Sequence, residues 1–316
     1  MKLAVLALDG VFDTGLTALL DVFGTANELS GGKEPLQVRT VGVRRRVRTD
    51  LGLLVPVHPA DDRDPPDLMV APALGTKMPP ALEAALQRRD VRDAVELLRY
   101  RSTHGTRMAA ACTGTFMLAA SGALDGRAAT TTWWLAPFFR QLYPQVRLDE
   151  SRMLVPAGKV VTAGAALAHL DLALWILRQH SPSLASLVAR YLMIDQRPSQ
   201  ALYIISDHLA HSDTLIERFE QWARARLAKG FSLTEAARAV GASERTLARR
   251  LHHVLGKTPL SYFQDLRIEH AVHRLQTGKA SVDAIASEVG YADGVTLRTL
   301  LRRKLGRGVR ELRSRG

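Results

Sequence analysis

Cysteine, aromatic side chains and long apolar runs are all scarce in this sequence. Its 316 residues include a single cysteine, Cys112, and only 6% aromatic residues. One thiol excludes an intramolecular disulfide and a zinc site built from several cysteines, and it fits a reducing compartment. No uninterrupted apolar run reaches the ~18 residues that cross a bilayer, and the first one, at 3–8, is too short for a signal peptide. We therefore expect a cytoplasmic protein that is neither secreted nor membrane-bound.

Positive charge is concentrated toward the C-terminus. The formal net charge is +12; residues 1–219 hold 24 basic and 22 acidic side chains, and residues 220–316 hold 19 basic and 9 acidic ones. A net charge of +10 on the second segment suits a polyanion such as nucleic acid. The charge alone is explained equally well by a solvated basic face that aids solubility. Motifs must decide between the two.

The first 180 residues alternate short apolar runs with amphipathic segments. Strand-like runs occupy 2–8, 36–42, 51–57, 68–71, 108–111 and 155–162, and helical spacing occurs at 15–29, 81–100 and 165–179. The Pro79-Pro80 pair marks the start of one helix over 81–100. This alternation predicts an α/β sandwich, in which a mostly parallel sheet is covered by helices on both faces.

A buried strand at 109–111 runs directly into Cys112-Thr113-Gly114 and then into helical spacing at 116–120. Such an elbow places the thiol at the carboxyl end of the sheet, where open α/β sheets hold ligands, and the following helix N-terminus would lower its pKa. We select Cys112, Thr113, Trp133 and Asp13 as candidates for a ligand pocket or redox site. A buried structural cysteine and ordinary aromatic packing remain the alternatives.

This part of the chain resembles the ThiJ/PfpI group of the class I glutamine-amidotransferase-like superfamily. The matching stretches lie within residues 2–180, at 19–23, 111–114, 124–131, 161–164 and 171–174. The resemblance implies a flavodoxin-like, amidotransferase-like fold and an elbow cysteine that, in the enzymes, works with a histidine and an acid.

The sequence departs from the pattern of those enzymes at both partner positions. Thr132-Trp133-Trp134 stands where a histidine is common in such proteins. The position of the acidic residue falls on Gly15, and Asp13 lies two residues before that position. Three histidines elsewhere in this region, His58, His104 and His169, are expected to serve packing or the surface rather than as a base. The chain is therefore predicted not to be an enzyme, with no catalytic residue, metal or cofactor.

The C-terminal hundred residues contain a near-repeat: 236–242 recurs at 285–291, an offset of 49. In both copies an alanine precedes a glycine by four residues, and a polar helix-start residue follows. The alanine permits close helix packing, and the glycine takes the left-handed conformation that ends a helix. Two helix-turn-helix units inside the basic segment are therefore predicted. The residues are Ala237, Gly241 and Ser243 in the first unit, and Ala286, Gly290 and Asp293 in the second.

Residues 214–313 resemble the AraC family of transcription regulators, through 232–237, 255–262, 267–271, 281–286 and 289–291. The likeness implies that one helix joins the two units and sets their recognition helices about one DNA turn apart. By this likeness, Arg245, Ala248 and Arg249 would face the bases in one major groove. Val295, Arg298 and Thr299 would face the bases in the next major groove. Arginine suits this task because its fork bonds guanine O6 and N7 together. The residues expected to contact DNA phosphates are Arg250, Lys257, Arg302, Arg303 and Lys304.

The two resemblances combine as in GlxA-type regulators of the AraC family. They imply a sensor and dimerisation domain at 1–180, a linker at 181–213 and an all-α DNA-binding domain at 214–316. We predict a bacterial transcription regulator that binds specific sequences in double-stranded DNA. Because activation is the commoner outcome in the family, we expect an activator. The resemblance adds a small-molecule effector, a homodimer and contact with RNA polymerase. The alternative is a Cys112-dependent hydrolase or hydratase, or a thiol redox sensor, fused to a DNA-binding domain.

Overall fold

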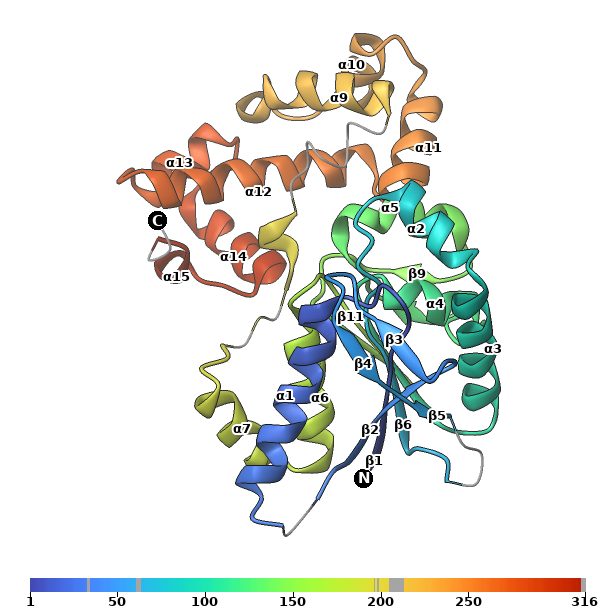
Figure 1. The fold of residues 1–316 in the computed structure, drawn as a ribbon. Helices are drawn as coiled ribbons and strands as arrows, with labels where there is room; N and C mark the ends of the chain where they lie inside the picture. Colours follow the sequence, from blue (N-terminus) through green and yellow to red (C-terminus); the bar gives the residue numbers. More distant parts are fainter. Residues whose placement is uncertain (33–34, 61–63, 196, 198, 205–212, 314–316) are drawn as a thin grey trace. The chain divides into compact units, whose positions relative to one another are not determined.

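The computed structural model describes residues 1–32, 35–60, 64–195, 197, 199–204 and 213–313. The chain divides into two compact units, Met1–Gln200 and Ala201–Gly316, coloured blue to yellow-green and yellow to red in Figure 1. The sequence placed a linker at 181–213, of which 205–212 lies outside the described residues. Its first part is the helix α7 (Pro182–Tyr191), which packs on the first unit because Leu184, Ala185 and Val188 are buried there.

The first unit is built on a seven-stranded sheet with the order β10-β11-β7-β6-β1-β2-β5. All neighbouring strands run parallel except β10 and β11, which form a hairpin. The mostly parallel sheet predicted from the sequence is confirmed. The strands are β1 (Lys2–Leu6), β2 (Gln37–Gly42), β5 (His58–Pro59), β6 (Leu68–Ala71), β7 (Arg107–Ala111), β10 (Leu154–Ala157) and β11 (Val160–Ala163). Two short pairs lie outside it: β3 (Arg46–Arg48) with β4 (Leu54–Pro56), and β8 (Ala128–Ala129) with β9 (Arg147–Leu148).

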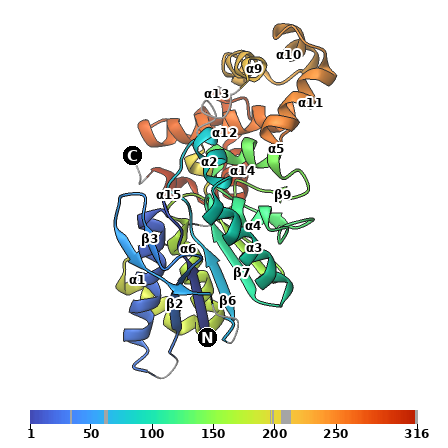
Figure 2. The same cartoon turned by 45° about the vertical axis from the view of Figure 1, so that its right-hand side comes forward.

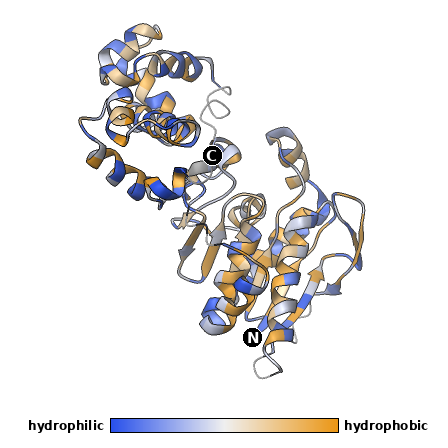
Figure 3. Cartoon of the chain, turned by 90° about the vertical axis from the view of Figure 1, so that its left-hand side faces the viewer, coloured by the Kyte–Doolittle hydropathy of each residue, from blue (hydrophilic) through white to orange (hydrophobic). Residues whose placement is uncertain are grey.

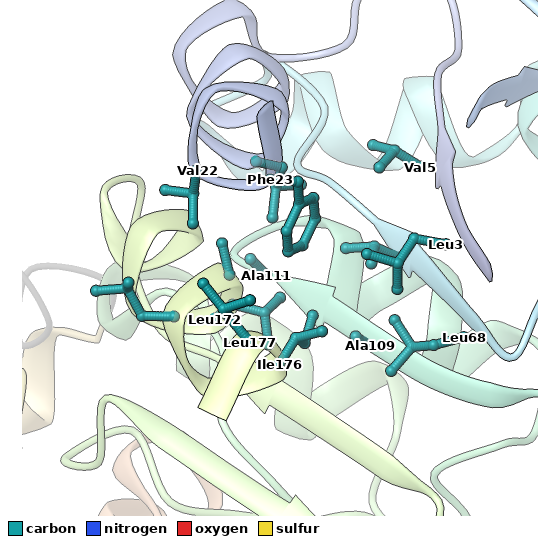
Figure 4. Packing of buried hydrophobic residues seen from close by; sticks show 14 of the residues in the cluster. Leu3, Val5, Val22, Phe23, Leu68, Ala109, Ala111, Leu172, Ile176 and Leu177 are labelled. Atoms are coloured by element: carbon teal, nitrogen blue, oxygen red, sulfur yellow. The ribbon is translucent and has the colours of Figure 1, made fainter. Parts of the chain in front are cut away.

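Helices cover both faces of this sheet, as Figures 1 and 2 show. Along β1, Leu3 and Val5 belong to the core on one face, and Ala4 and Leu6 to the core on the other. This alternation follows from the two-residue period of a strand. Phe23 and Leu172 close the first core (Figure 4). One face carries α1 (Asp13–Leu29), α6 (Ala168–His180) and α7; the other carries α2 (Pro79–Leu86), α3 (Arg89–Thr103), α4 (Gly114–Ala120) and α5 (Ala136–Leu142).

The single helix expected over 81–100 is wrong, because the chain forms α2 and α3 with a break between them. Arg88 adopts an extended conformation at the break, with φ −62° and ψ 145°. Its guanidinium binds Asp90 and donates to the carbonyl of Asp9 at 2.5 Å. The apolar stripe that the sequence shows continues across both helices, which is why the pattern concealed the break.

The second unit is helical, and its two helix pairs repeat each other. Ser232 and Ser281 cap the first helix of each pair, and Ser243 and Asp293 cap the second. The elements are η2 (Ala201–Tyr203), α9 (Thr214–Arg224), η3 (Leu227–Lys229), α10 (Leu233–Ala239), α11 (Glu244–Leu255), α12 (Pro259–Thr277), α13 (Val282–Glu288), α14 (Gly294–Leu305) and α15 (Val309–Arg313). Polar and apolar residues alternate along them (Figure 3). Among the described residues no helix has the length and apolar character that a membrane span requires.

Gly114 at the start of α4 is the tightest point between the sheet and its helices. A methyl group there would lie 2.2 Å from the Ala71 carbonyl oxygen and 2.6 Å from that of Pro72. Because both are backbone atoms that cannot swing away, we expect Gly114→Ala to lower the unfolding free energy of the first unit by about 1–3 kcal/mol. Urea unfolding measures this change.

Gly24→Ala is the matched control for this substitution. Gly24 lies within α1, and a methyl group added there meets nothing within 4 Å. Replacing a helical glycine by alanine at an open position stabilises by up to about 1 kcal/mol. Equal stability of the two variants would contradict the steric account.

Candidate functional site

Cys112 follows β7 in a left-handed backbone conformation, with φ +54°. Holding a non-glycine residue in the left-handed conformation costs about 1–3 kcal/mol, so contacts around Cys112 must stabilise this conformation. Its amide donates to the carbonyl of Ala163 at 3.0 Å. Its carbonyl accepts from the hydroxyl of Thr131 at 2.7 Å and from the amide of Thr115 at 3.2 Å. The strand therefore ends in the elbow that the sequence predicts.

The thiol of Cys112 is buried, and burial raises its pKa to about 11. The amide of Thr113 and the side chain of Thr132 lower that pKa, but desolvation outweighs both. The sequence analysis expected the start of the following helix to lower this pKa; the Thr113 amide at that start does lower it, but because the side chain is only 5% exposed the net shift is upward. Thr113 itself is turned away, since its hydroxyl donates to the carbonyl of Leu74 at 2.9 Å.

His169 fills the space in which an acidic side chain at position 15 would lie. A Cβ on Gly15 would come within 2.7 Å of His169 Nε2. The imidazole accepts from the amide of Ala73 at 3.1 Å through Nε2, and Nδ1 donates to the carbonyl of Ala166 at 2.5 Å. Burial lowers its pKa to about 4. Because both of its nitrogens are hydrogen-bonded to the backbone, His169 has no free nitrogen to take a proton from the thiol, and it is a packing residue, as expected.

The other two histidines are also remote from the elbow. His104 is exposed, bonds the carbonyl of Tyr100 at 2.8 Å through Nδ1, and precedes β7, whereas Cys112 follows that strand. His58 lies exposed in β5, four strands from β7 in the sheet order and so roughly 19 Å away at ~4.8 Å per strand. Neither histidine is placed to take a proton from the thiol.

Polar groups are buried at the carboxyl ends of β1, β6 and β7, which are neighbours in the sheet. Asp13 at the start of α1 accepts from the amide of Leu51 at 3.0 Å through Oδ2. Its Oδ1 is buried without a hydrogen-bond partner among the described residues, as are the hydroxyls of Thr76 and Thr115. Trp133, 8% exposed, lies in η1 (Trp133–Leu135) directly after the Thr132 that faces the thiol.

Gln200, the last residue of the first unit, reaches into this region and was missed by the sequence analysis. Its side chain is 1% exposed and donates to the carbonyl of Thr131 at 2.9 Å and to that of Arg152 at 3.2 Å. Its Oε1 accepts from the amide of Ala165 at 3.1 Å. Because the hydroxyl of Thr131 binds the Cys112 carbonyl, hydrogen bonds link the end of the unit to the elbow without interruption. A lone polar residue in a linker gives no sequence signal for such a role.

Helices α11 and α14 contain the residues that the AraC likeness assigns to DNA recognition, and we call them the recognition helices after that expectation. Arg245 and Arg249 are exposed and Ala248 is half-buried, while Leu247 and Leu251 on the opposite side are buried. In α14, Leu297 and Leu301 take the buried side, and the exposed residues are Val295, Arg298 and Thr299. Both helices thus have one face in the core and one open face.

The residues expected to hold phosphates fall into two groups. Arg302 and Arg303 are exposed on α14, and no ion pair is found for them among the described residues. Arg250 pairs with Asp213, the N-cap residue of α9. The remaining two, Lys257 and Lys304, both bind the carboxylate of Asp265, Lys257 at 3.0 Å. Part of the predicted phosphate-binding charge is therefore neutralised within the protein.

Arg267 in α12 connects η3, which precedes the first helix pair, to the turn of the second pair. Its Nε donates to the carbonyl of Leu227 at 2.9 Å, and the guanidinium lies 4.8 Å from the ring centre of Phe263 and 5.3 Å from that of Tyr291. Gly290 has φ +77°, and a Cβ there would lie 2.3 Å from a guanidinium nitrogen of Arg267. The glycine is required both by the turn and by this contact.

Cys112 should behave as a buried, unreactive thiol. With its pKa raised to about 11, the rate of alkylation by iodoacetamide in the folded protein should keep rising about tenfold per pH unit up to pH ~10, since only the thiolate reacts. In urea the same rate should level off above pH ~9, because a solvated thiol titrates near 8.5. Since Cys112 is the one cysteine, mass spectrometry reads the reaction directly. A plateau below pH ~7 in the folded protein would show an activated thiol instead.

Comparison with known proteins supports both halves of this description. The DJ-1/PfpI family profile matches residues 1–179, and that of a helix-turn-helix domain matches residues 222–315. The transcriptional regulator GbdR of Pseudomonas aeruginosa (strain UCBPP-PA14) is 24% identical over 235 residues, which are 71% of this chain and 64% of GbdR. The regulator GlxA of Rhizobium meliloti (strain 1021) is 28% identical over 211 residues, 62% of this chain and 61% of GlxA. The chain thus spans less than two thirds of the length of these curated relatives.

A solved structure shows the same fold as the first unit. The crystal structure of an AraC family transcriptional regulator from Pseudomonas putida has a TM-score of 0.52 at 20% identity, and the match covers 60% of this chain and 98% of that one. The parallel sheet, the elbow at Cys112 and the match over residues 1–179 agree with one another. The chain belongs to the DJ-1/PfpI family and carries a helix-turn-helix domain after the family's fold.

Proposed function

We propose that the protein is a cytoplasmic transcription regulator that binds specific sequences in double-stranded DNA. The observation that carries this proposal is the pair of recognition helices, each with one face in the core and an open face of basic and short side chains. α12 joins the two pairs, and Arg267 and Asp265 fasten elements of both to it. Two such helices on one scaffold suit successive major grooves. The regulators GbdR and GlxA, to which the chain is similar, support the same function.

The first unit, on this proposal, senses a small polar molecule and has no catalytic role. Within the described part of the chain, Asp13 Oδ1 and the buried hydroxyls of Thr76 and Thr115 have no hydrogen-bond partner, whereas buried polar groups are normally satisfied. A ligand that supplied donors and acceptors there would bind one conformation of the unit in preference to others, which is what a switch requires. The chain of hydrogen bonds through Gln200 offers a route from the elbow to the end of the unit.

A hydrolase or redox role for Cys112 has no comparable support. The thiol is buried with a raised pKa, and the imidazole of His169 is neutral and bonded through both nitrogens. A nucleophilic cysteine needs a base or a lowered pKa. We therefore propose a binding function for this unit and no reaction.

Arg249→Ala tests whether α11 reads bases. A DNA fragment that the protein prefers is first selected from genomic DNA, by its binding to the purified protein at physiological salt. Loss of a bidentate contact with guanine should then weaken binding to that fragment about 5- to 150-fold, equivalent to 1–3 kcal/mol, and should change binding to random DNA far less. Fluorescence anisotropy at two salt concentrations measures both affinities.

Arg218→Ala is the control, because Arg218 is an exposed arginine on α9 outside the recognition helices. It removes the same charge and should leave the preference for the selected fragment unchanged. If selection yields no preferred fragment, or if Arg249→Ala weakens all DNA equally, the basic unit is a nonspecific anchor.

A further inference from the structure

The two recognition helices carry different chemistry at matching positions. The second residue after the N-cap, which is Ser243 in α11 and Asp293 in α14, is Arg245 in α11 and Val295 in α14, and both are exposed. The next turn holds Arg249 in α11 and Thr299 in α14. The first open face therefore has two cations where the second has two β-branched side chains.

Val295 is an exposed apolar residue in a place where exposure has no structural benefit. Val295 is 67% exposed, in the first turn of α14, while Leu297, Leu301 and Leu305 of the same helix are buried in the core. β-Branched residues are also poorer helix formers than the straight-chain residues that usually fill open helix surfaces. Neither core packing nor helix propensity accounts for a valine here.

Thr299 extends this apolar surface by one turn. Its hydroxyl donates to the carbonyl of Val295 at 3.0 Å, within the same helix. With the oxygen turned back to the backbone, the methyl group of Thr299 is left on the open side, next to Val295 along the i, i+4 direction. The second recognition surface thus begins with an apolar strip, flanked by Arg298.

We propose that Val295 recognises the C5-methyl group of a thymine in the major groove. That methyl is the apolar group that base edges present there, and the isopropyl side chain of valine has no atom that can donate or accept a hydrogen bond. The two half-sites then differ in kind: Arg245 and Arg249 read guanines in the first, and Val295 with the methyl of Thr299 selects a thymine in the second. This inference rests on the proposed DNA-binding function.

Deoxyuridine, which is thymine without the methyl group, is the direct probe. In the preferred fragment, each thymine of the second half-site is replaced in turn by deoxyuridine. For the wild-type protein one replacement should weaken binding about fourfold, the equivalent of ~0.8 kcal/mol for one buried methyl. Val295→Ala should bind the unmodified fragment more weakly and should lose nothing further at that replacement.

Leu187→Ala serves as the matched control, because Leu187 is a 45% exposed apolar residue on α7 in the first unit. It should respond to deoxyuridine as the wild type does. If no replacement weakens wild-type binding, or if Val295→Ala responds as strongly as the wild type, the thymine contact is refuted while DNA recognition stands. If selection returns no preferred fragment at all, the proposed function fails and the inference fails with it.

Discussion

The DNA binding proposed for the second unit depends on contacts that two residues in the middle of α12, Asp265 and Arg267, make with segments before and after that helix. Arg267 bonds the carbonyl of Leu227 before the first helix pair and lies against Tyr291 in the turn of the second. The carboxylate of Asp265 binds Lys257, just after α11, and Lys304, near the end of α14. These contacts hold both recognition helices to one rigid element, so the distance between them is set by the protein rather than by the DNA. On the proposed function, bases at two places can then be read only in one register.

Burial governs the first unit in a similar way. The sheet is covered on both faces, so the elbow at its carboxyl end is also enclosed, and desolvation decides the chemistry of Cys112 and His169. The thiol is kept protonated, and both nitrogens of the imidazole are engaged in hydrogen bonds to the backbone. The buried oxygens of Asp13 and Thr115 are costly unless something satisfies them. That cost is a physical reason for a ligand to shift the unit between states.

Patterns of short range could be predicted from the sequence, and contacts of long range could not. The alternation in β1 and the repeated alanine, glycine and cap residues each reflect a local period or turn, so the sheet and both helix-turn-helix units were expected. The hydrogen bond between the Ala73 amide and the His169 imidazole joins residues 96 positions apart, and no sequence pattern around either residue predicts it. The raised pKa of Cys112 depends on tertiary burial, which the helix start alone does not reveal. Likewise, the residue pattern of α12 does not predict that Lys257 and Lys304 both bind the carboxylate of Asp265.

The rigidity of the double helix-turn-helix is tested most directly by changing the spacing of the DNA. Two half-sites lie about one helical turn apart on a bound fragment, and five or ten base pairs are inserted between them. If α12 fixes the spacing, both insertions should reduce affinity to that of the first half-site alone, with no recovery at ten base pairs. Recovery of affinity when a full turn is inserted would show that the two units move independently, and would contradict the fastening by Arg267 and Asp265.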